Sequence, residues 1–326
     1  MTWQKFHKSF STHSFGRNFV FSFDLMGRST YFLVLVCLCV ATNAFLLKNL
    51  KKAIVLGIGS ISIGISTVTL PTNVNALDEV ITVIGAGGKT GKIITNKLLK
   101  DHKNVRPVYR SQTTLDENII TYTGDVTKPE SLDDAIKGAD VVIFAASASK
   151  NGGNAASVDN NGLYNTAVES IKFKVPKLVV ISSGAITRPN SLAFKFTNLF
   201  GGIMDQKIQG ESRLIAEYNA NANSDISYII IRPGGLMDGE GAGEENVTIN
   251  QGDAVAGDID RTDVADAAIA AAYSKSMPKN VIFEMYQKGK GAPLEKILKT
   301  PTGYERDEKT YEQKFANLKS GIVKIP

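Results

Sequence analysis

Three glycines spaced three residues apart carry the clearest chemical signal in this 326-residue chain. Gly85, Gly88 and Gly91 lie in the stretch VIGAGGKTG, after the apolar run 80–84 and before the helical pattern 89–100. In such a strand–turn–helix unit, the first glycine allows a tight turn, the second lets a phosphate approach the backbone, and the third lets the helix pack against the strand. Unpaired N–H groups at the helix start then face the phosphate. The spacing predicts a pyrophosphate site for a dinucleotide, formed by Gly85, Gly87, Gly88, Lys89, Thr90 and Gly91.

The residue after the second expected strand, 105–109, bears on the choice of dinucleotide. Sites for NAD carry an acid at this point, which binds the ribose 2′-hydroxyl. Here the residue is Arg110, and the first acid that follows is Asp116. A guanidinium pairs with a 2′-phosphate through charge-assisted hydrogen bonds, and Lys89 could reach the same phosphate. The sequence favours NADP(H) over NAD(H), the alternative being that both residues are solvated surface cations.

The residues that follow the next two strands complete the predicted cofactor site. Asp125 and Val126 come after the third strand. The Asp125 carboxylate either accepts a hydrogen bond from the adenine amino group or caps a helix that starts near Pro129. Small residues follow the fourth strand, where the backbone must pass close to a cofactor: Ala145, Ala146 and Ser147.

Two serines after the fifth strand, Ser182 and Ser183, are the candidates for catalysis. A hydroxyl group can orient a carbonyl oxygen, but a serine alone is a poor proton donor. The alternative is that these serines contact the nicotinamide ribose or cap the strand.

Strand and helix patterns alternate from residue 79 onward. The expected strands are 80–84, 105–109, 119–122, 141–145, 178–181, 227–231 and 281–286, and the expected helices are 89–100, 129–137, 163–173, 205–219 and 263–273. Several strands are continuously apolar, which indicates a parallel sheet covered on both faces. We therefore predict an α/β fold with a Rossmann-type doubly wound parallel sheet, as a single domain over 78–326 with a small C-terminal substrate region.

Composition excludes several functions for this domain. Residues 1–77 carry seven Lys or Arg and one acid, whereas the remaining residues carry 30 basic and 31 acidic side chains. The net charge of +5 thus belongs to the N-terminal segment, and nucleic-acid binding loses its main support. Both cysteines, Cys37 and Cys39, lie in that segment, and His102 is the one histidine beyond it. No disulfide, metal site or histidine-based triad is expected in the domain.

The N-terminal segment has the pattern of targeting sequences. A basic, aromatic start is followed by an apolar run from 31 to 40 and by small residues at Ala41 and Ala44, which predicts a signal peptide over 1–44. Segment 45–77 begins with Phe45, followed by LLKNLKK, and holds a second apolar run, 53–76. We interpret it as a transit peptide in which the apolar run is a thylakoid-transfer signal, an anchor or part of the transit peptide itself.

These motifs resemble those of the atypical short-chain dehydrogenase/reductase family, in its NAD(P)H-binding, NmrA-like branch with biliverdin reductase B and plant plastid relatives. The matching stretches include VIGAGGKTG, VYR, GDVTKPESL, ADVVIFAAS, KLVVISS and IIIRPGGL. The resemblance implies a Rossmann domain, bound NADP(H), and a substrate region built from inserts at 187–202 and 236–252. The stretch ATNAF resembles the cleavage motif of the bipartite plastid presequences of diatoms and related algae, which implies a plastid location.

One departure from that family concerns catalysis. Typical members use Tyr-x-x-x-Lys, in which the lysine lowers the pKa of the tyrosine that passes the proton. Tyr164 is followed four residues later by Val168, and Tyr218 by Ala222, so neither pair can do this.

Two hypotheses follow. The chain is an NADPH-dependent oxidoreductase that reduces a small organic acceptor in a plastid, or it is a catalytically silent NADP(H)-binding redox sensor or scaffold of a plastid complex. A nucleotide-sugar epimerase is weaker, because such enzymes retain the tyrosine. The expected partner is a small-molecule substrate, with association to the thylakoid membrane left open and the oligomeric state unknown. We also expect a mobile lid at 238–245 and an amphipathic, solvated helix within 304–319.

Overall fold

The computed structural model describes residues 79–322, except 102, 116–118, 150–151, 223–224, 297 and 299–301. The predicted signal peptide, 1–44, and transit segment, 45–77, lie outside the described residues. Among the helices of the described part, none has the length and apolar character needed to cross a membrane.

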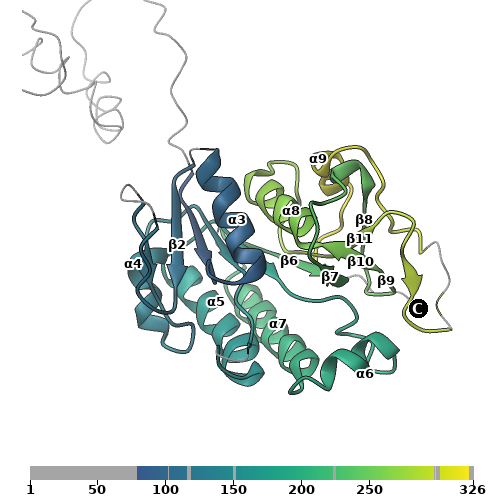
Figure 1. The fold of residues 1–326 in the computed structure, drawn as a ribbon, viewed down its shortest axis with the longest axis horizontal. Helices are drawn as coiled ribbons and strands as arrows, with labels where there is room; N and C mark the ends of the chain where they lie inside the picture. Colours follow the sequence, from purple (N-terminus) through teal and green to yellow (C-terminus); the bar gives the residue numbers. More distant parts are fainter. Residues whose placement is uncertain are drawn as a thin grey trace, which may run out of the picture. The chain divides into compact units, whose positions relative to one another are not determined.

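An eight-stranded sheet forms the centre of the domain (Figure 1). Its spatial order is β3 (Tyr122–Thr123), β2 (Val105–Tyr109), β1 (Ile81–Ile84), β4 (Val141–Phe144), β5 (Lys177–Ile181), β6 (Ser227–Pro233), β11 (Val281–Gln287) and β8 (Val247–Asn250). The strands from β3 to β11 run parallel, and β8 pairs antiparallel with β11. The order of strands reverses between β1 and β4, and ligands of such sheets bind at the carboxyl ends of strands beside that point.

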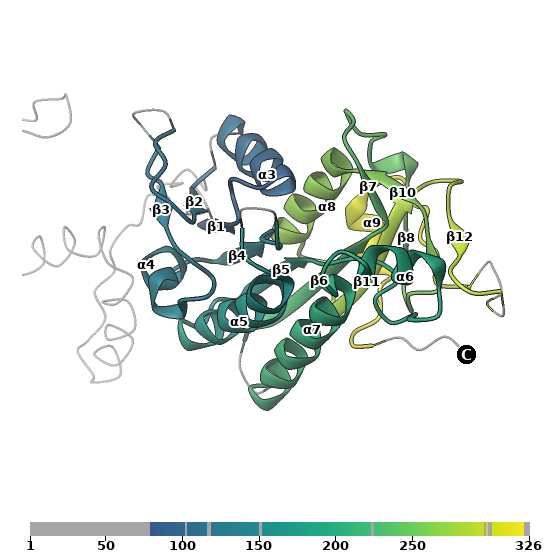
Figure 2. The same cartoon turned by 60° about the horizontal axis from the view of Figure 1, so that its bottom comes forward.

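Helices cover both faces of the sheet (Figure 2). On one side lie α3 (Lys89–Lys100) and α8 (Arg261–Tyr273), and on the other lie α4 (Asp133–Ile136), α5 (Leu163–Lys172) and α7 (Ile203–Ala220). Strand side chains alternate between two cores because successive residues of a strand point to opposite faces. Ile143 of β4 belongs to the same core as Ile94 of α3, whereas Val142 belongs to the core that contains Leu214 of α7. The predicted doubly wound fold is confirmed.

Some local elements differ from the sequence prediction. The third strand is β3 and not 119–122, and the expected helix at 129–137 is a 3₁₀ turn, η1 (Pro129–Leu132), followed by α4. A π-helical turn, η2 (Ala156–Gly162), precedes α5 and had no sequence signal. Also unforeseen were α6 (Leu192–Asn198), η3 (Glu244–Asn246), β8, and two small sheets that pair β7 (Gly235–Met237) with β10 (Asp258–Asp260) and β9 (Val255–Ala256) with β12 (Ala292–Pro293).

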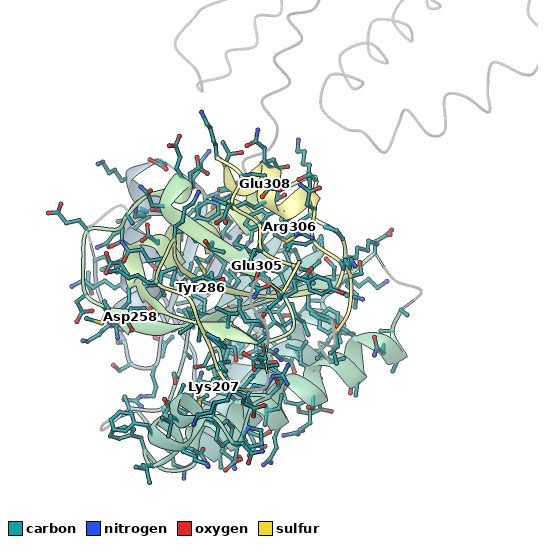
Figure 3. The ribbon with its side chains drawn as sticks, turned by 90° about the vertical axis from the view of Figure 1, so that its right-hand side faces the viewer. Lys207, Asp258, Tyr286, Glu305, Arg306 and Glu308 are labelled. Carbon is teal, nitrogen blue, oxygen red and sulfur yellow. The ribbon has the colours of Figure 1, made fainter. Side chains whose placement is uncertain are left out.

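The helix predicted within 304–319 is amphipathic as expected, but it is shorter, and the prediction that it is solvated is wrong for its apolar face. The helix α9 spans only Tyr311–Ala316, and Tyr311, Lys314 and Phe315 are buried. Phe315 packs 5.7 Å from the ring of Phe283, while the Lys314 ammonium donates to the backbone carbonyl of a residue in η3. The preceding residues form a bridge to β8 through Arg306 (Figure 3). Apolar residues four apart in a charged segment thus mark a face that packs against the core.

Candidate functional site

A cavity of about 400 Å³ lies at the carboxyl ends of β1, β2, β3 and β4. Most of the predicted cofactor residues line it: Gly85, Gly87, Gly88, Arg110, Asp125, Val126, Ala145, Ala146 and Ser147. Lys89, Thr90 and Gly91 form the first turn of α3 and are not among its lining residues. Residues that the sequence did not single out also line it, chiefly Tyr109, Ser111, Thr113, Ser149, Gly152 and Val158. We call this space the dinucleotide cavity.

The glycines of the loop are required by close backbone approaches. Gly85 has a φ of +84°, and a Cβ atom added to it would lie 2.7 Å from the backbone nitrogen of Ala146. A Cβ on Gly91 would lie 2.1 Å from the carbonyl oxygen of Gly85. At Gly88 the nearest atom, the Gly85 carbonyl oxygen, is 3.2 Å away. Gly85 and Gly91 therefore shape the loop itself, and Gly88 leaves room beside the cavity that a ligand can use.

The start of α3 suits a phosphate group. The Lys92 N–H donates to the Gly88 carbonyl at 2.8 Å, so the N–H groups of Lys89, Thr90 and Gly91 precede the first intrahelical hydrogen bond. The first turn carries no acidic residue that would neutralise the positive end of the helix dipole. These groups fit the pyrophosphate of a dinucleotide.

Two charged side chains line the dinucleotide cavity, Arg110 and Asp125. The Asp125 carboxylate accepts hydrogen bonds from the N–H and Oγ of Thr127, at 2.9 and 2.8 Å. These hydrogen bonds, together with the positive charges of Lys128 and Arg110, hold the pKa of Asp125 below its usual range. The carboxylate thus closes a turn at Thr127, whereas the helix start near Pro129 has no side-chain cap.

Lys89 points toward the acidic tract 238–245. Its ammonium lies 2.9 Å from the Asp238 carboxylate, whose other oxygen accepts from Arg261 at the start of α8. The hydrogen bond from Lys89 and the charge of Arg261 lower the pKa of Asp238. The tract is also held by Asp263, which accepts the N–H groups of residues 242 and 243. Contact between Lys89 and a 2′-phosphate stays a prediction, as does motion of the tract.

The two serines after β5 lie in different surroundings. Ser182 is buried, and its Oγ has no hydrogen-bond partner among the described residues. The Ser183 Oγ donates to the carbonyl of Gly184 at 3.1 Å. Neither serine is among the lining residues of the dinucleotide cavity. Their role in catalysis stays a prediction.

Ser182 belongs to a buried polar row that crosses the sheet. The strand register places Arg232, Glu284 and Asn250 side by side on β6, β11 and β8. Ser182 follows directly after β5, and its N–H donates to the Ile231 carbonyl of β6 at 2.8 Å. Arg232 lies 2.6 Å from Glu211 of α7 and 3.4 Å from Glu284. Burial and the nearby Asp253 raise the pKa of Glu284 to about 8, against the opposing effect of Arg232. The Arg232 guanidinium lies closer to Glu211 than to Glu284. The negative charge of Glu284 is therefore the less well compensated of the two.

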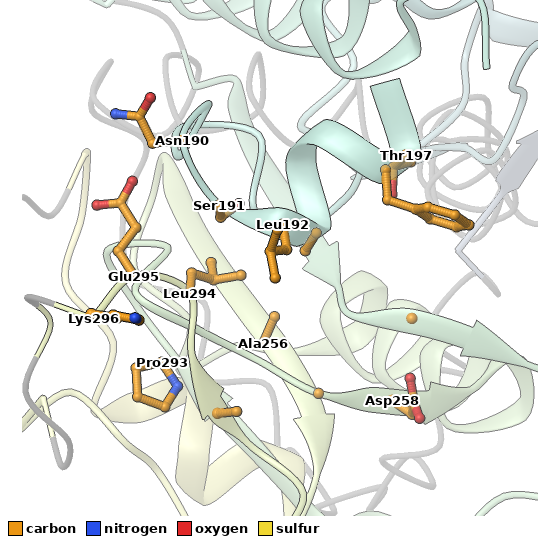
Figure 4. Close-up of a pocket in the computed structure, with 15 residues that line it drawn as sticks. Asn190, Ser191, Leu192, Thr197, Ala256, Asp258, Pro293, Leu294, Glu295 and Lys296 are labelled. Carbon is orange, nitrogen blue, oxygen red and sulfur yellow. The ribbon is translucent and has the colours of Figure 1, made fainter. Parts of the chain in front are cut away.

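A second and larger cavity, of about 1180 Å³, lies between α6 and the small sheets, and we call it the outer cavity (Figure 4). One wall comes from 190–197, inside the first predicted insert. The facing wall comes from 256–258 and 292–296, and not from the second predicted insert, 236–252. Leu192 of α6 faces Ala256 and Leu294 across this space. Gly235, two residues after the end of β6 and the first residue of β7, brings the outer cavity to the same edge of the sheet as the dinucleotide cavity.

Comparison with known proteins identifies the family. A family model described as NAD(P)H-binding matches residues 85–275, from the first glycine of the loop to two residues beyond the end of α8. The chain belongs to this NAD(P)H-binding family. A chloroplastic protein of Arabidopsis thaliana, the uncharacterized protein At2g34460, is 32% identical over 208 residues, which is 58% of this chain and 70% of that protein.

Solved structures share the fold of this NAD(P)H-binding protein. The anaerobillin reductase ChuY from Escherichia coli O157:H7 is 20% identical, with a TM-score of 0.52 over 64% of this chain and 98% of that one. A short-chain dehydrogenase/reductase from Veillonella parvula, solved with NADP, is 15% identical, with a TM-score of 0.50 over 65% of this chain and 96% of that one. At these identities the likeness shows the fold alone, and it agrees with the predicted resemblance.

Neither tyrosine considered from the sequence lies at the dinucleotide cavity of this family member. Burial raises the pKa of the Tyr218 phenol, whose hydroxyl has no partner among the described residues. The Tyr164 hydroxyl donates to Glu217 at 3.3 Å, and the guanidinium of Arg213 lies 3.9 Å from the centre of the Tyr164 ring. Arg213 and Glu217 thus both contact Tyr164 on the surface between α5 and α7. The described residues also hold no group of side chains that could bind a metal ion.

Proposed function

We propose that the chain is an NADPH-dependent reductase that passes a hydride to a bulky, largely apolar organic acceptor. The observation that carries this proposal is the dinucleotide cavity, where the glycine loop, including Gly88 at the N-cap of α3, meets Arg110. Membership of the NAD(P)H-binding family supports the cofactor class.

The preference for NADPH over NADH rests on charge. Arg110 follows β2, where the adenosine ribose of a dinucleotide lies in this fold. The one acid that lines the cavity, Asp125, follows β3 instead and is committed to a turn. A guanidinium beside the ribose attracts a 2′-phosphate, and a 2′-hydroxyl gains much less from it.

The proposed acceptor site is the outer cavity. With the pyrophosphate at α3, the nicotinamide half of the cofactor extends over β4 and β5 toward β6, where the outer cavity begins. From β1 to β6 there are three strand spacings, or about 14 Å at roughly 4.8 Å each. When bound, the nicotinamide supplies the hydride, and the chain supplies the surfaces that orient both partners.

The class of acceptor follows from the lining of the outer cavity. Its walls carry mainly apolar side chains, among them Leu192, Phe196, Pro293 and Leu294. Leu192 and Phe196 are 84% and 67% exposed. Large apolar side chains that are exposed next to one another commonly mark a surface that binds a ligand or another molecule. We infer that the acceptor covers them. The proposed location is a plastid, on the basis of the N-terminal segment and the chloroplastic relative.

The test is a fluorescence titration of NADPH and NADH with the wild type, Arg110→Glu and the control Lys100→Glu. Lys100 is an exposed residue at the far end of α3 and undergoes the same change to glutamate. Loss of a charge-assisted hydrogen bond costs about 1.5–3 kcal/mol. We therefore expect Arg110→Glu to weaken NADPH binding about tenfold or more and NADH binding much less, while Lys100→Glu changes neither. An unchanged NADPH preference in Arg110→Glu would contradict the 2′-phosphate assignment.

A second measurement addresses reduction. The wild type with NADPH is incubated with quinones, flavins, tetrapyrroles and carotenoid ketones, and NADPH oxidation is followed. Oxidation with at least one apolar acceptor is the expected result. Stoichiometric NADPH binding without oxidation by any of them would favour the alternative, a catalytically silent redox sensor or scaffold.

A further inference from the structure

Large apolar side chains are exposed along α6 and in the turn that follows it. In the turn, Leu199 and Phe200 are 79% and 68% exposed, in addition to Leu192 and Phe196 of the helix. The rings of Phe196 and Phe200 meet edge to face, with their centres 5.9 Å apart. We call these four side chains the α6 patch. Leu192 and Phe196 line the outer cavity, but Leu199 and Phe200 do not, so an acceptor in the cavity would leave the turn uncovered.

The opposite side of α6 is held by the domain. Phe194 is buried in a small core with Met204 of α7. The Asn198 side chain also turns toward α7, where its Oδ1 accepts the N–H of Met204 at 3.0 Å and its Nδ2 donates to Asp205 at 2.7 Å. Figure 1 shows α6 at the edge of the domain, beyond the start of α7. The α6 patch is therefore the outward face of a helix whose inward face is anchored.

The backbone of the turn is hydrogen-bonded within the segment itself. The N–H groups of residues 199, 200, 201 and 202 donate to the carbonyls of residues 196, 197, 199 and 198, at distances between 2.9 and 3.3 Å. A segment that enters lipid must satisfy its backbone donors internally, because the hydrocarbon offers no partner for them. The turn that carries Leu199 and Phe200 can thus leave water without leaving these donors unpaired.

The charge around the α6 patch is positive. The segment 170–204 contains no acidic residue, and Lys195 of α6 is exposed beside the patch. The two acids that line the outer cavity, Asp258 and Glu295, belong to the facing wall. Cations that flank an apolar face suit a lipid surface with anionic headgroups.

We propose that the α6 patch inserts into the surface of an anionic lipid layer. The helix has seven residues, far fewer than the roughly 20 that span a bilayer, so it lies at the interface and does not cross it. Because Leu192 and Phe196 belong both to the patch and to the outer cavity, the cavity then opens beside the lipid, where apolar acceptors dissolve. That consequence rests on the proposed function, whereas the lipid contact itself does not.

The test places a fluorescent reporter in the α6 patch of the full chain. The natural tryptophan, Trp3, is replaced by phenylalanine, and one tryptophan is introduced by Phe200→Trp or by the control Ile120→Trp. Ile120 is 74% exposed and lies beside β3, and Figure 2 shows β3 and α6 on opposite sides of the domain. The vesicles contain phosphatidylglycerol and brominated phosphatidylcholine, whose bromine atoms quench a tryptophan that enters the lipid. We expect strong quenching in Phe200→Trp and almost none in Ile120→Trp, which stays in water even if another segment holds the chain on the vesicle.

Two substitutions in the Phe200→Trp protein separate the apolar from the charge contribution. Leu199→Ser should lower the ratio of inserted to free α6 about tenfold, because one large apolar side chain no longer leaves water. Lys195→Glu should lower this ratio at least about fivefold on vesicles with phosphatidylglycerol and much less on pure phosphatidylcholine. Unchanged insertion in Leu199→Ser would contradict the contact through the patch.

Absence of quenching in Phe200→Trp would overturn the inference, and so would equal quenching of the two reporters. A blue shift of the Phe200→Trp emission that grows with protein concentration, without vesicles, would assign the patch to a second copy of the chain instead. Circular dichroism checks that each variant is folded, and NADPH is titrated into the same samples. NADPH binding without quenching refutes the lipid contact alone, whereas quenching without NADPH binding refutes the proposed function alone.

Discussion

Adding one methyl group to the glycine loop, at Gly91 or at Gly88, distinguishes the effect of the loop on protein stability from its effect on ligand binding. In Gly91→Ala the new Cβ would lie 2.1 Å from the carbonyl oxygen of Gly85 and 2.8 Å from its carbonyl carbon. Both are backbone atoms, so α3 must move away from β1 by roughly an ångström to restore ordinary contact. In Gly88→Ala the nearest atom is 3.2 Å away, and the backbone at Gly88 is extended, which alanine adopts readily.

The expected magnitudes differ accordingly. Overpacking against a fixed neighbour costs about 1–3 kcal/mol. We expect Gly91→Ala to lower the free energy of unfolding by about 2 kcal/mol. For a domain of this size, this is a fall in Tm of about 4–8 °C. Gly88 is the N-cap of α3, a position at which alanine is less favourable than glycine, so Gly88→Ala should cost about 1 kcal/mol. Its Cβ, however, occupies space beside the dinucleotide cavity and should weaken NADPH binding about tenfold or more.

Urea unfolding and thermal melts measure the stability of both variants, and fluorescence titration measures their NADPH affinity. Gly88→Ala is the matched control for Gly91→Ala, since both add one methyl group to the same loop. The reasoning about close backbone approach is wrong if Gly91→Ala is as stable as the wild type. The reasoning about the phosphate site is wrong if Gly88→Ala binds NADPH with unchanged affinity.

Three further predictions concern charge and exposed apolar surface. The folded protein keeps the Glu284 proton up to about pH 8, whereas the unfolded chain releases it near pH 4.5, so stability should fall as pH rises between these values, by at most about 1.4 kcal/mol per unit. Glu284→Gln should flatten that fall in urea unfolding at pH 6, 7 and 8, and parallel curves would contradict it. Leu192→Ser should reduce binding of the dye 1-anilinonaphthalene-8-sulfonate at the outer cavity, whereas Ile120→Ser, at a residue 74% exposed on another part of the surface, should not. Asp238→Asn releases Lys89 from its ion pair and should raise NADPH affinity if Lys89 reaches the 2′-phosphate; an unchanged affinity would count against that contact.

The sequence predicted the helices, strands and site residues whose positions depend on the local pattern of apolar residues and glycines. The helix at 89–100 and the strand at 105–109 have the expected bounds, because apolar periodicity and glycine positions define them within a few residues. Arg110 follows the expected strand 105–109 and Ser147 follows the expected strand 141–145, and both residues line the dinucleotide cavity. In a parallel sheet all carboxyl ends meet at one edge, so these long-range positions followed from local information.

What the sequence could not supply depends on contacts between distant segments. Asp159 of η2 and Lys207 of α7 form an ion pair at 2.7 Å although they are 48 positions apart, and no periodicity links them. The facing walls of the outer cavity come from 190–197 and 292–296, which no local pattern pairs. The segment around α9 is rich in charged residues, and its pattern did not show that the aromatic side chains of Tyr311 and Phe315 pack against the core, so a solvated helix was expected where one face of the helix is buried.

The two cavities differ in how tightly the backbone around them is packed. Around the dinucleotide cavity, the glycines at 85 and 91 have no room for a side chain, so backbone meets backbone and the geometry is fixed. Beside the outer cavity, α6 is joined to α7 through Gly201 and Gly202, both in the left-handed region with nothing within 4 Å of an added Cβ. Leu192 and Phe196 of α6 are exposed, and Phe194 is the side chain that joins the helix to a small buried core with Met204 of α7. It follows that substitutions on α6 should alter which acceptors bind while leaving NADPH affinity unchanged, because the α6 side chains do not line the dinucleotide cavity.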